Sequence, residues 1–499
     1  MLSGLSTSRA TADVRDRGRF APFRLELLTV LNVVLAAAVA VGVLRLVTTV
    51  GLTALYSNDE GWSAYHQLEA LSGLNPYPPP GSLSYNVYPP LGFYIYGVFG
   101  WLTGDFITTG RITSLVAFLL TAGGIGLVAR TIGCSKGQSL FASLVYAAVL
   151  LFDHDYIGTN TPQAVSHLFT VTGLLLCLRQ RRSDASLVAA ALFFVAAFGV
   201  KHNMIVAPVA ATLWMALHDR RSAVVLAVSG IVFGLAGAAL FQWYYGVPLW
   251  TVLNSGRLWL LSSSLRSIAG RLPTMLLPIG ASIALWRLFP QDRYVRFGAI
   301  YLLLAFAFAV YFLGGSGTGG NQLFDIELAL ALNAGLGLAR LSRHGRYDKA
   351  YALCFFLPAL VIIVFTTVTG RFARYWLDHH APAVMVAQSD VAFLKAHPGQ
   401  ALCRAQALCF WAGKTDSTDL WNIEQSVATG RRDGHELKEV LARQDYAVLQ
   451  LCPPPNILCS PHETRNRYSD EIAAIVATHY RMAYQNADGA MWVRRSDSK

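Results

Sequence analysis

Long apolar stretches with few charges recur along the first 370 residues, and they constrain the fold more than any other feature of the sequence. A helix needs about 20 predominantly apolar residues to cross a bilayer core that is about 30 Å thick. Only 14% of all residues are charged, whereas soluble domains carry about 25%. We therefore predict a polytopic α-helical membrane protein. About 11 transmembrane helices are expected, at residues 27–44, 109–131, 138–153, 161–179, 185–200, 202–217, 222–244, 272–290, 295–313, 323–341 and 348–370.

Basic residues fall on alternate connections between these stretches, and this pattern predicts the orientation of the chain. Clusters such as Arg179–Arg182 mark cytoplasmic loops, because Lys and Arg accumulate on that side of a membrane. The same loops account for the net charge of +11, which therefore does not indicate binding of nucleic acid. We expect a cytoplasmic N-terminal tail at residues 1–26 and a transmembrane domain at 27–384, with one large outer loop at 51–108.

One apolar segment, Tyr88–Leu102, is not counted as a span. Counting it would reverse every later loop and place the arginine-rich connections outside. The segment begins with two prolines after its first tyrosine and is rich in Tyr and Trp. Amphipathic aromatic rings prefer the membrane interface, so a helix lying in that interface is expected.

The composition becomes that of a soluble protein beyond about residue 385. The apolar cluster Tyr446–Leu451 predicts a strand and Glu436–Arg443 predicts a helix. We expect residues 385–499 to form a small α/β domain outside the cytoplasm. Four cysteines there favour disulfides over zinc, because their spacings of six and seven residues are wider than those of tight zinc-binding pairs. The sequence leaves the pairing open among Cys403, Cys409, Cys452 and Cys459.

The residues that carry chemistry gather in the predicted outer connections, beginning with Asp59-Glu60-Gly61 after the first membrane helix. Carboxylates near hydrocarbon are costly and tend to mark functional sites. Asp59 could instead cap a helix that runs through Trp62 to Leu71.

Several motifs follow this pair, namely Leu71-Ser-Gly-Leu-Asn-Pro-Tyr77, Tyr88-Pro-Pro-Leu-Gly92 and Gly110-Arg111. Together they resemble the first outer loop of the GT-C superfamily of membrane glycosyltransferases. More narrowly, they resemble the bacterial family-39-like branch related to protein mannosyltransferases and aminoarabinose transferases. The resemblance implies a site on the outer face of a bacterial inner membrane. There, a sugar would pass from a polyprenyl-phosphate donor to an unidentified glycan, lipid or protein acceptor.

The chemistry of such a transfer agrees with the residues present. A carboxylate must remove a proton from the acceptor hydroxyl while the lipid phosphate leaves, and cations or a metal must offset the phosphate charge. Asp59 matches the position of the family's catalytic base, and Glu60 would orient the acceptor or help to bind a metal.

Asp153, His154 and Asp155 occupy the next predicted outer connection, where GT-C enzymes often place a second acidic motif. They could hold the donor sugar, and Asp155 could ligate a divalent metal such as Mg²⁺ or Mn²⁺. The alternative is a polar loop end that caps the following helix.

The candidates for binding the donor are Lys201, Arg257, Tyr88 and Asn321. Lys201 lies in a very short connection between apolar stretches, where an unpaired ammonium would be costly. Arg257 offers a planar fork for phosphate oxygens, although snorkelling to lipid headgroups is a simpler explanation. Tyr88 belongs to the family-like Pro-Pro-Leu motif, and Asn321 ends a glycine-rich segment that resembles a late outer loop of some GT-C relatives.

A transporter or flippase for lipid-linked or small polar substrates is the alternative function. Such a protein should show paired inverted halves with broken helices near the middle of the membrane. The sequence shows neither, and most of its acidic candidates lie at predicted helix ends.

Overall fold

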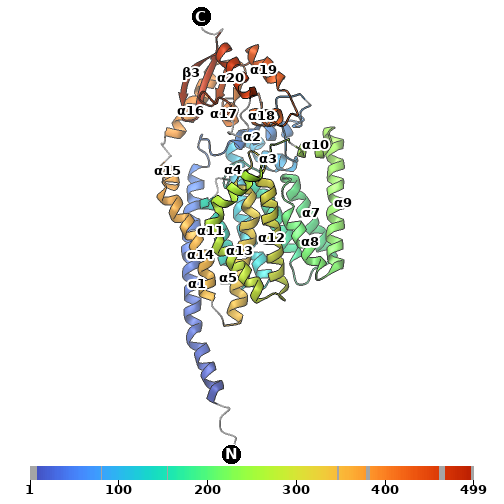
Figure 1. Cartoon of the computed structure of the whole chain (residues 1–499), viewed down its shortest axis with the longest axis vertical. Helices are drawn as coiled ribbons and strands as arrows, with labels where there is room; N and C mark the ends of the chain where they lie inside the picture. The colour runs from blue at the N-terminus through green and yellow to red at the C-terminus, as the bar shows by residue number, and fades with distance from the viewer. Residues whose placement is uncertain are drawn as a thin grey trace, which may run out of the picture.

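The computed structural model describes residues 8–79, 81–153, 156–254, 256–345, 348–377, 382–459 and 467–495 of the chain. A bundle of long helices carries a small sheet-containing domain at one end (Figure 1). We call this the capped end. The N-terminal helix extends well beyond the bundle at the opposite end.

In the described residues, eleven helices build the bundle, and each coincides with one of the predicted spans. They are α1 (Ser8–Thr49), α4 (Phe106–Thr131), α5 (Lys136–Asp153), α6 (Gln163–Cys177), α7 (Asp184–Val200), α8 (Val206–Ala216), α9 (Arg220–Tyr245), α11 (Leu261–Leu288), α12 (Arg293–Leu313), α13 (Phe324–Arg343) and α14 (Asp348–Val368). Seven helices in the described part of the chain are long and apolar enough to cross a membrane. The predicted class of a polytopic helical membrane protein is confirmed.

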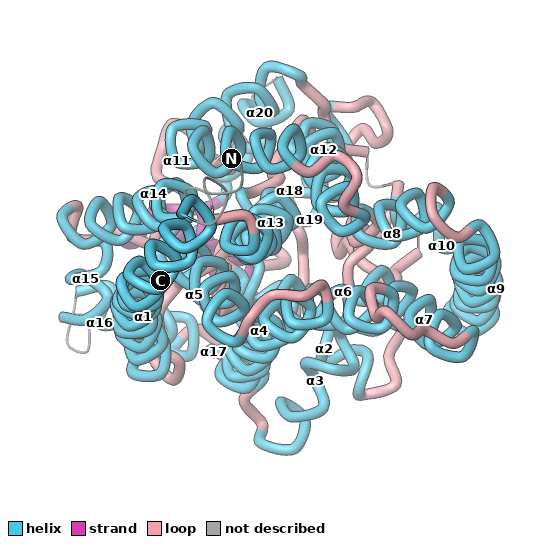
Figure 2. Tube along the Cα trace, turned by 90° about the horizontal axis from the view of Figure 1, so that it is seen from below, coloured by secondary structure: helices cyan, strands magenta, loops and turns pink. Residues whose placement is uncertain are grey.

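Helix α13 forms the core of the bundle. Every residue from Phe324 to Leu341 is buried, and Figure 2 shows the helix surrounded by its neighbours. By contrast, α9 lies at the edge of the bundle and exposes large apolar side chains such as Ile231 and Leu235. An apolar outer surface of this kind suits contact with lipid.

Two segments differ from the sequence prediction. The connection at 245–271 was expected to be a loop, but α11 already begins at Leu261. Leu261, Leu265 and Ile268 recur at helical spacing, and the serines and Arg266 between them hid this amphipathic pattern. Helix α1 also begins at Ser8, within the segment expected to be a tail.

Shorter elements connect the bundle at its capped end. They are α2 (Asp59–Leu71), α3 (Leu91–Thr103), α10 (Leu249–Leu253), the 3₁₀ helix η1 (Gly320–Leu323) and α15 (Arg371–Leu377). Helix α3 falls within the segment expected to lie in the interface, and it leaves Phe99, Trp101 and Leu102 exposed.

The C-terminal domain has three layers, in which helices cover both faces of a four-stranded sheet. The strand order is β1-β2-β4-β3. Strands β1 and β2 are parallel, whereas β4 runs antiparallel to both β2 and β3. Because side chains alternate along a strand, Leu449 packs on one face and Val448 on the other. The elements are α16 (Pro382–Ala396), β1 (Ala401–Cys403), α17 (Gln406–Trp411), α18 (Leu420–Ala428), α19 (His435–Ala442), β2 (Val448–Leu451), α20 (Arg467–His479), β3 (Tyr480–Asn486) and β4 (Gly489–Arg494).

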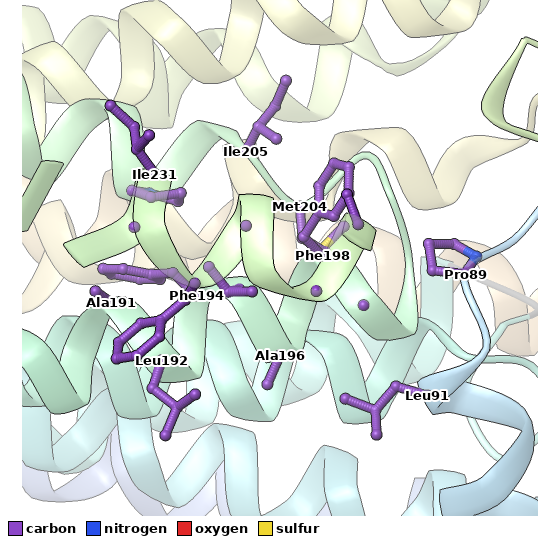
Figure 3. Close-up of a pocket in the computed structure, with 18 of the residues that line it drawn as sticks. Pro89, Leu91, Ala191, Leu192, Phe194, Ala196, Phe198, Met204, Ile205 and Ile231 are labelled. Atoms are coloured by element: carbon purple, nitrogen blue, oxygen red, sulfur yellow. The ribbon is translucent and has the colours of Figure 1, made fainter. Parts of the chain in front are cut away.

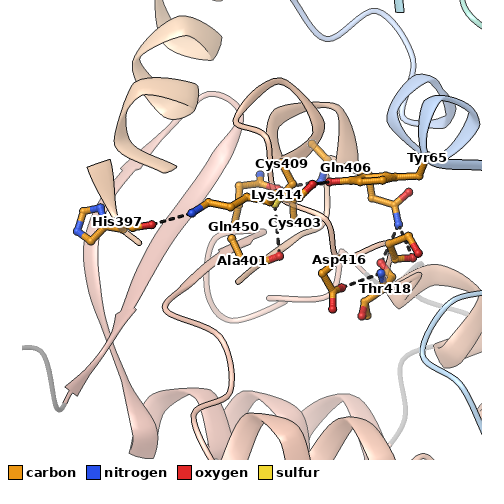
Figure 4. Close-up of a disulfide and its surroundings, with 12 residues drawn as sticks. Tyr65, His397, Ala401, Cys403, Gln406, Cys409, Lys414, Asp416, Thr418 and Gln450 are labelled. Carbon is orange, nitrogen blue, oxygen red and sulfur yellow. Dashed lines mark hydrogen bonds between the residues drawn. A yellow bond between two sulfur atoms is a disulfide. The ribbon is translucent and has the colours of Figure 1, made fainter. Parts of the chain in front are cut away.

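The structure pairs the four cysteines of this domain as Cys403–Cys409 and Cys452–Cys459. The first disulfide joins β1 to α17 beside the contact with the bundle (Figure 4). There, the Tyr65 hydroxyl of α2 donates a hydrogen bond to the carbonyl of Lys414 at 2.8 Å.

Helix α17 crosses the start of α2 at Gly61, the third residue of the Asp59-Glu60-Gly61 motif. A Cβ atom at Gly61 would collide with the backbone of Ala407. The glycine therefore allows the C-terminal domain to lie directly on the helix that begins with Asp59.

Candidate active site

A cavity of about 230 Å³ lies between the bundle and the C-terminal domain. Asp59, Trp62 and Tyr88 contribute to its wall from the first large connection, and Arg257 does so from the connection after α10. Polar residues of the C-terminal domain complete the wall: Arg404, Gln406, Thr418, Asp419 and Asn422. The structure thus brings three of the predicted site residues, Asp59, Tyr88 and Arg257, to one space.

Asp59 is the first residue of α2, and its side chain opens to the cavity. No residue in the described ranges forms a hydrogen bond or ion pair with its carboxylate, and Asn58 rather than Asp59 occupies the N-cap position. The alternative capping role therefore does not occupy this side chain. The carboxylate oxygens are free to accept a proton from a molecule in the cavity.

The charges around Asp59 are mostly positive. The surrounding protein limits hydration of the carboxylate and raises its pKa above the ordinary value, while Lys201 and Arg257 oppose that rise. Burial also lowers the pKa of Lys201 to about 7, and here Asp59 opposes the change. Asp59 and Lys201 therefore lie close enough for each charge to influence the pKa of the other group.

Lys201 is held by a polar network at the capped end of α6. Its ammonium donates a hydrogen bond to Oε1 of Gln163, and the same oxygen accepts one from Nδ2 of Asn321 at 3.1 Å. The ammonium also lies 5.7 Å from the centre of the Tyr88 ring. Gln163 therefore joins two predicted residues, Lys201 and Asn321. Gln163 was not among the predicted site residues, because an uncharged residue at a helix start carries no distinctive signal in the sequence.

The side chain of Arg257 lines the cavity. Within the described part of the chain, no hydrogen bond or ion pair to its guanidinium is formed, and its Nε atom is buried. A buried, unpaired donor group is costly. This arrangement suits an anion that binds in the cavity.

Arg404 and Trp421 of the C-terminal domain were not predicted as site residues. The Nε of Arg404 donates to the carbonyl of Leu458 at 3.2 Å, and its guanidinium lies 5.4 Å from the centre of the Trp421 ring. Burial lowers the pKa of Arg404, while Asp419 and Asp59 oppose the shift. These residues lie more than 340 positions from Asp59, so no local pattern could link them to it.

The side chain of Glu60 lies in a different environment from that of Asp59. It forms a bidentate ion pair with Arg111 of α4, with both nitrogen–oxygen distances at 2.7 Å and both side chains fully buried. Its Oε1 also accepts a hydrogen bond from the backbone of Asn160 at 3.0 Å. Glu60 does not line the cavity, so its carboxylate positions the start of α2 against the bundle.

The second acidic motif is only partly described. Asp153, the last residue of α5, forms an ion pair with Arg271 of α11 and does not line the cavity. His154 and Asp155 lie outside the described residues, so the predicted metal ligand Asp155 has no structural account.

The described residues around Asp59 do not fit a divalent metal ion. Lys201, Arg257 and Arg404 supply positive charge there, and both carboxylate oxygens of Asp419 accept hydrogen bonds from Asn422. Among described residues, Asp433, His435 and Glu436 alone bring three potential ligand atoms within 4.8 Å of one another. None of these three lines the cavity, and exposed acidic groups of this kind are common without a metal.

An apolar groove begins next to this polar site. It measures about 1110 Å³ and runs between α3, α7, α8 and α9 (Figure 3). Pro89 and Leu91, which follow Tyr88 in the chain, line its end nearest the cavity, while Ile231 and Phe194 line it further along the helices. The side chains along the groove are almost entirely hydrocarbon.

Comparisons with known proteins agree with this architecture. The family model for dolichyl-phosphate-mannose-protein mannosyltransferase matches residues 87–245. No curated protein sequence matches the chain.

Solved structures that share the fold include those of ArnT and AglB. ArnT from Cupriavidus metallidurans bound to undecaprenyl phosphate aligns over 95% of this chain and 98% of its own, with 15% identity and a TM-score of 0.59. The archaeal oligosaccharyltransferase AglB from Archaeoglobus fulgidus, in complex with an inhibitory peptide and a dolichol-phosphate, aligns over 93% of this chain and 74% of its own. For AglB the identity is 11% and the TM-score 0.51. The predicted resemblance to GT-C membrane glycosyltransferases is confirmed, and the chain has their fold.

Proposed function

We propose that this protein is a membrane glycosyltransferase that moves a sugar from a polyprenyl-phosphate carrier to an acceptor hydroxyl. The observation that carries the proposal is the carboxylate of Asp59, which has no partner among the described residues and lies in a cavity lined by Arg257 and Arg404, with Lys201 close enough to act on its charge. A base without a partner beside several cations suits proton removal coupled to departure of a phosphate. The known ligands of ArnT and AglB, undecaprenyl phosphate and dolichol-phosphate, support a lipid carrier of this class.

The apolar groove next to the polar cavity supports a position for the donor. The polyprenyl chain would lie in the groove, and the phosphate would meet Lys201 and Arg257 near Tyr88. In the reaction, Asp59 takes the proton of the acceptor hydroxyl, and that oxygen forms a bond to the anomeric carbon. The bond from this carbon to the phosphate oxygen breaks, and its electron pair stays on the phosphate. The lipid phosphate thereby gains one negative charge, which the two cations offset.

The acceptor enters from the side of the C-terminal domain in this proposal. Trp421 and Arg404 form that wall of the cavity, and an aromatic face beside a polar group is a common arrangement at sites that bind ligands with one apolar and one polar side. We propose that the site faces the outer side of a bacterial inner membrane and that the N-terminus is cytoplasmic. The alternation of basic loops supports this orientation.

The test is sugar transfer by the purified protein from a panel of radiolabelled polyprenyl-phosphate sugars, with Asp59→Asn as the variant. Loss of a general base lowers rates by about 10² to 10⁴. Asp416→Asn is a matched control, because Asp416 lies near Tyr65 at the same domain interface but does not line the cavity. Full transfer by Asp59→Asn would remove the proposed base. Absence of transfer by the wild type from every donor would favour the alternative of a transporter.

A further inference from the structure

The connection that carries Arg257 is held by contacts to the C-terminal domain. Three residues at alternate positions of this connection, Asn254, Gly256 and Leu258, each form a hydrogen bond with α18 or the residues directly after it. Arg257 lies between the second and the third of them. Because its own side chain has no protein partner among described residues, the backbone of this connection decides where its guanidinium lies.

Two contacts define the attachment most clearly. Arg431 donates through Nη1 to the carbonyl of Asn254 at 2.6 Å, and through Nη2 to Oδ1 of the same residue at 3.1 Å. The Thr429 hydroxyl donates to the carbonyl of Gly256 at 3.0 Å. Gly256 has a φ of +60°, and a Cβ atom there would lie 2.5 Å from Cδ of Arg431. The left-handed conformation and the close approach both require glycine.

The other side of the connection is fixed to the glycine-rich segment before η1. The backbone of Ser316 donates to the carbonyl of Leu258 at 2.8 Å, and Leu260 donates to the carbonyl of Gly314 at 2.8 Å. The connection therefore lies between the bundle and the C-terminal domain. Thr429 and Arg431 contact residues that precede Arg257 in the chain. The backbone contacts with Ser316 and Gly314 involve Leu258 and Leu260, which follow Arg257.

We propose that Thr429 and Arg431 are positioning residues that hold Arg257 in place to bind the phosphate of the lipid carrier. The inference rests on the proposed function, because it takes the phosphate to be the ligand of Arg257. Neither residue lines the cavity, so each acts on the phosphate through the backbone next to Arg257. The C-terminal domain would in this way set the affinity of the enzyme for its carrier.

The experiment measures binding of undecaprenyl phosphate to the full-length protein in detergent by native mass spectrometry, with undecaprenol as the phosphate-free probe. Thr429→Val and Arg431→Gln are each expected to weaken undecaprenyl phosphate binding about three- to tenfold, in line with the loss of single hydrogen bonds. Binding of undecaprenol should not change. Thr429→Ser keeps the hydroxyl and should restore wild-type affinity.

A double-mutant cycle with Arg257→Gln separates positioning from general stabilisation. If Arg431 acts through Arg257, then Arg431→Gln has no further effect on affinity in the Arg257→Gln background. Arg467→Gln, an exposed arginine of the same domain, is the matched control and should leave binding unchanged.

Three results would overturn the inference: an equal loss of affinity in both backgrounds, an equal loss for undecaprenol, or unchanged binding in the single variants. Failure of the proposed function itself looks different, because Arg257→Gln alone would then leave undecaprenyl phosphate binding intact.

Discussion

Replacement of Glu60 by Gln gives the sharpest test of how the site is built. Glu60 and Arg111 are both fully buried, and the guanidinium also donates to the carbonyls of Leu52 and Ala54 at 2.8 Å. The substitution keeps the shape of the side chain but leaves the charge of Arg111 unpaired. Breaking a buried pair in this way costs about 3 to 5 kcal/mol.

An exposed ion pair of the same chain provides the scale. Oε2 of Glu439 lies 3.6 Å from Nη1 of Arg443, and about 60% of each side chain is exposed. Such exposed pairs contribute about 0.2 to 1 kcal/mol to the free energy of unfolding. We therefore expect Glu60→Gln to lower the free energy of unfolding several times more than Glu439→Gln. Unfolding by SDS in mixed micelles, followed by tryptophan fluorescence with reversibility checked, measures both.

The same experiment separates a positioning role from the catalytic role that the sequence suggested for Glu60. In a positioning role, Arg111→Gln costs less in the Glu60→Gln background than in the wild type, because the ion pair is already lost. The reasoning is refuted if Glu60→Gln is as stable as Glu439→Gln and yet inactive. That outcome would return Glu60 to the chemistry.

Three further predictions concern the groove, the ammonium and a disulfide. Gly234 of α9 lines the groove, and a Cβ atom there would meet no other atom within 4 Å, so Gly234→Trp should weaken binding of undecaprenyl phosphate but spare a short-chain analogue in the same assay. Because the pKa of Lys201 is lowered to about 7, affinity for a polyprenyl phosphodiester should fall as the pH rises through 7, whereas Lys201→Arg should bind equally well across this range. The Cys452–Cys459 bridge closes a separation of seven residues, so Cys452→Ser with Cys459→Ser should destabilise the C-terminal domain by about 2 kcal/mol, measured by its thermal unfolding.

The helices of the bundle were predictable because the local sequence of each apolar stretch determines its structure. An apolar stretch of membrane length becomes a helix wherever it occurs, since every backbone group must be satisfied within the segment. All eleven predicted stretches coincide with helices for this reason. The start of α11 was not found, because polar residues around Arg266 interrupt an otherwise amphipathic turn.

Candidate site residues were predictable where one residue was conspicuous by itself or belonged to a motif. Lys201 stood out because an ammonium between apolar helices is costly. Asp59 and Glu60 looked equivalent in the sequence, yet consecutive residues of a helix point about 100° apart. One side chain therefore reaches the cavity and the other reaches Arg111 of α4. Arg404 was missed because only the folded C-terminal domain brings it near Asp59.

The two walls of the cavity come from parts of the chain that are far apart in the sequence, and this has a consequence for biosynthesis. Asp59 emerges from the ribosome about 345 residues before Arg404, which at about 5 to 20 residues per second corresponds to roughly 17 to 70 seconds. During this time the first helices of the nascent chain are already available for insertion, but the cavity lacks the wall that Arg404 and Trp421 provide. An unfinished chain therefore has no complete site, and a truncated product that lacks the C-terminal domain would occupy the membrane without activity.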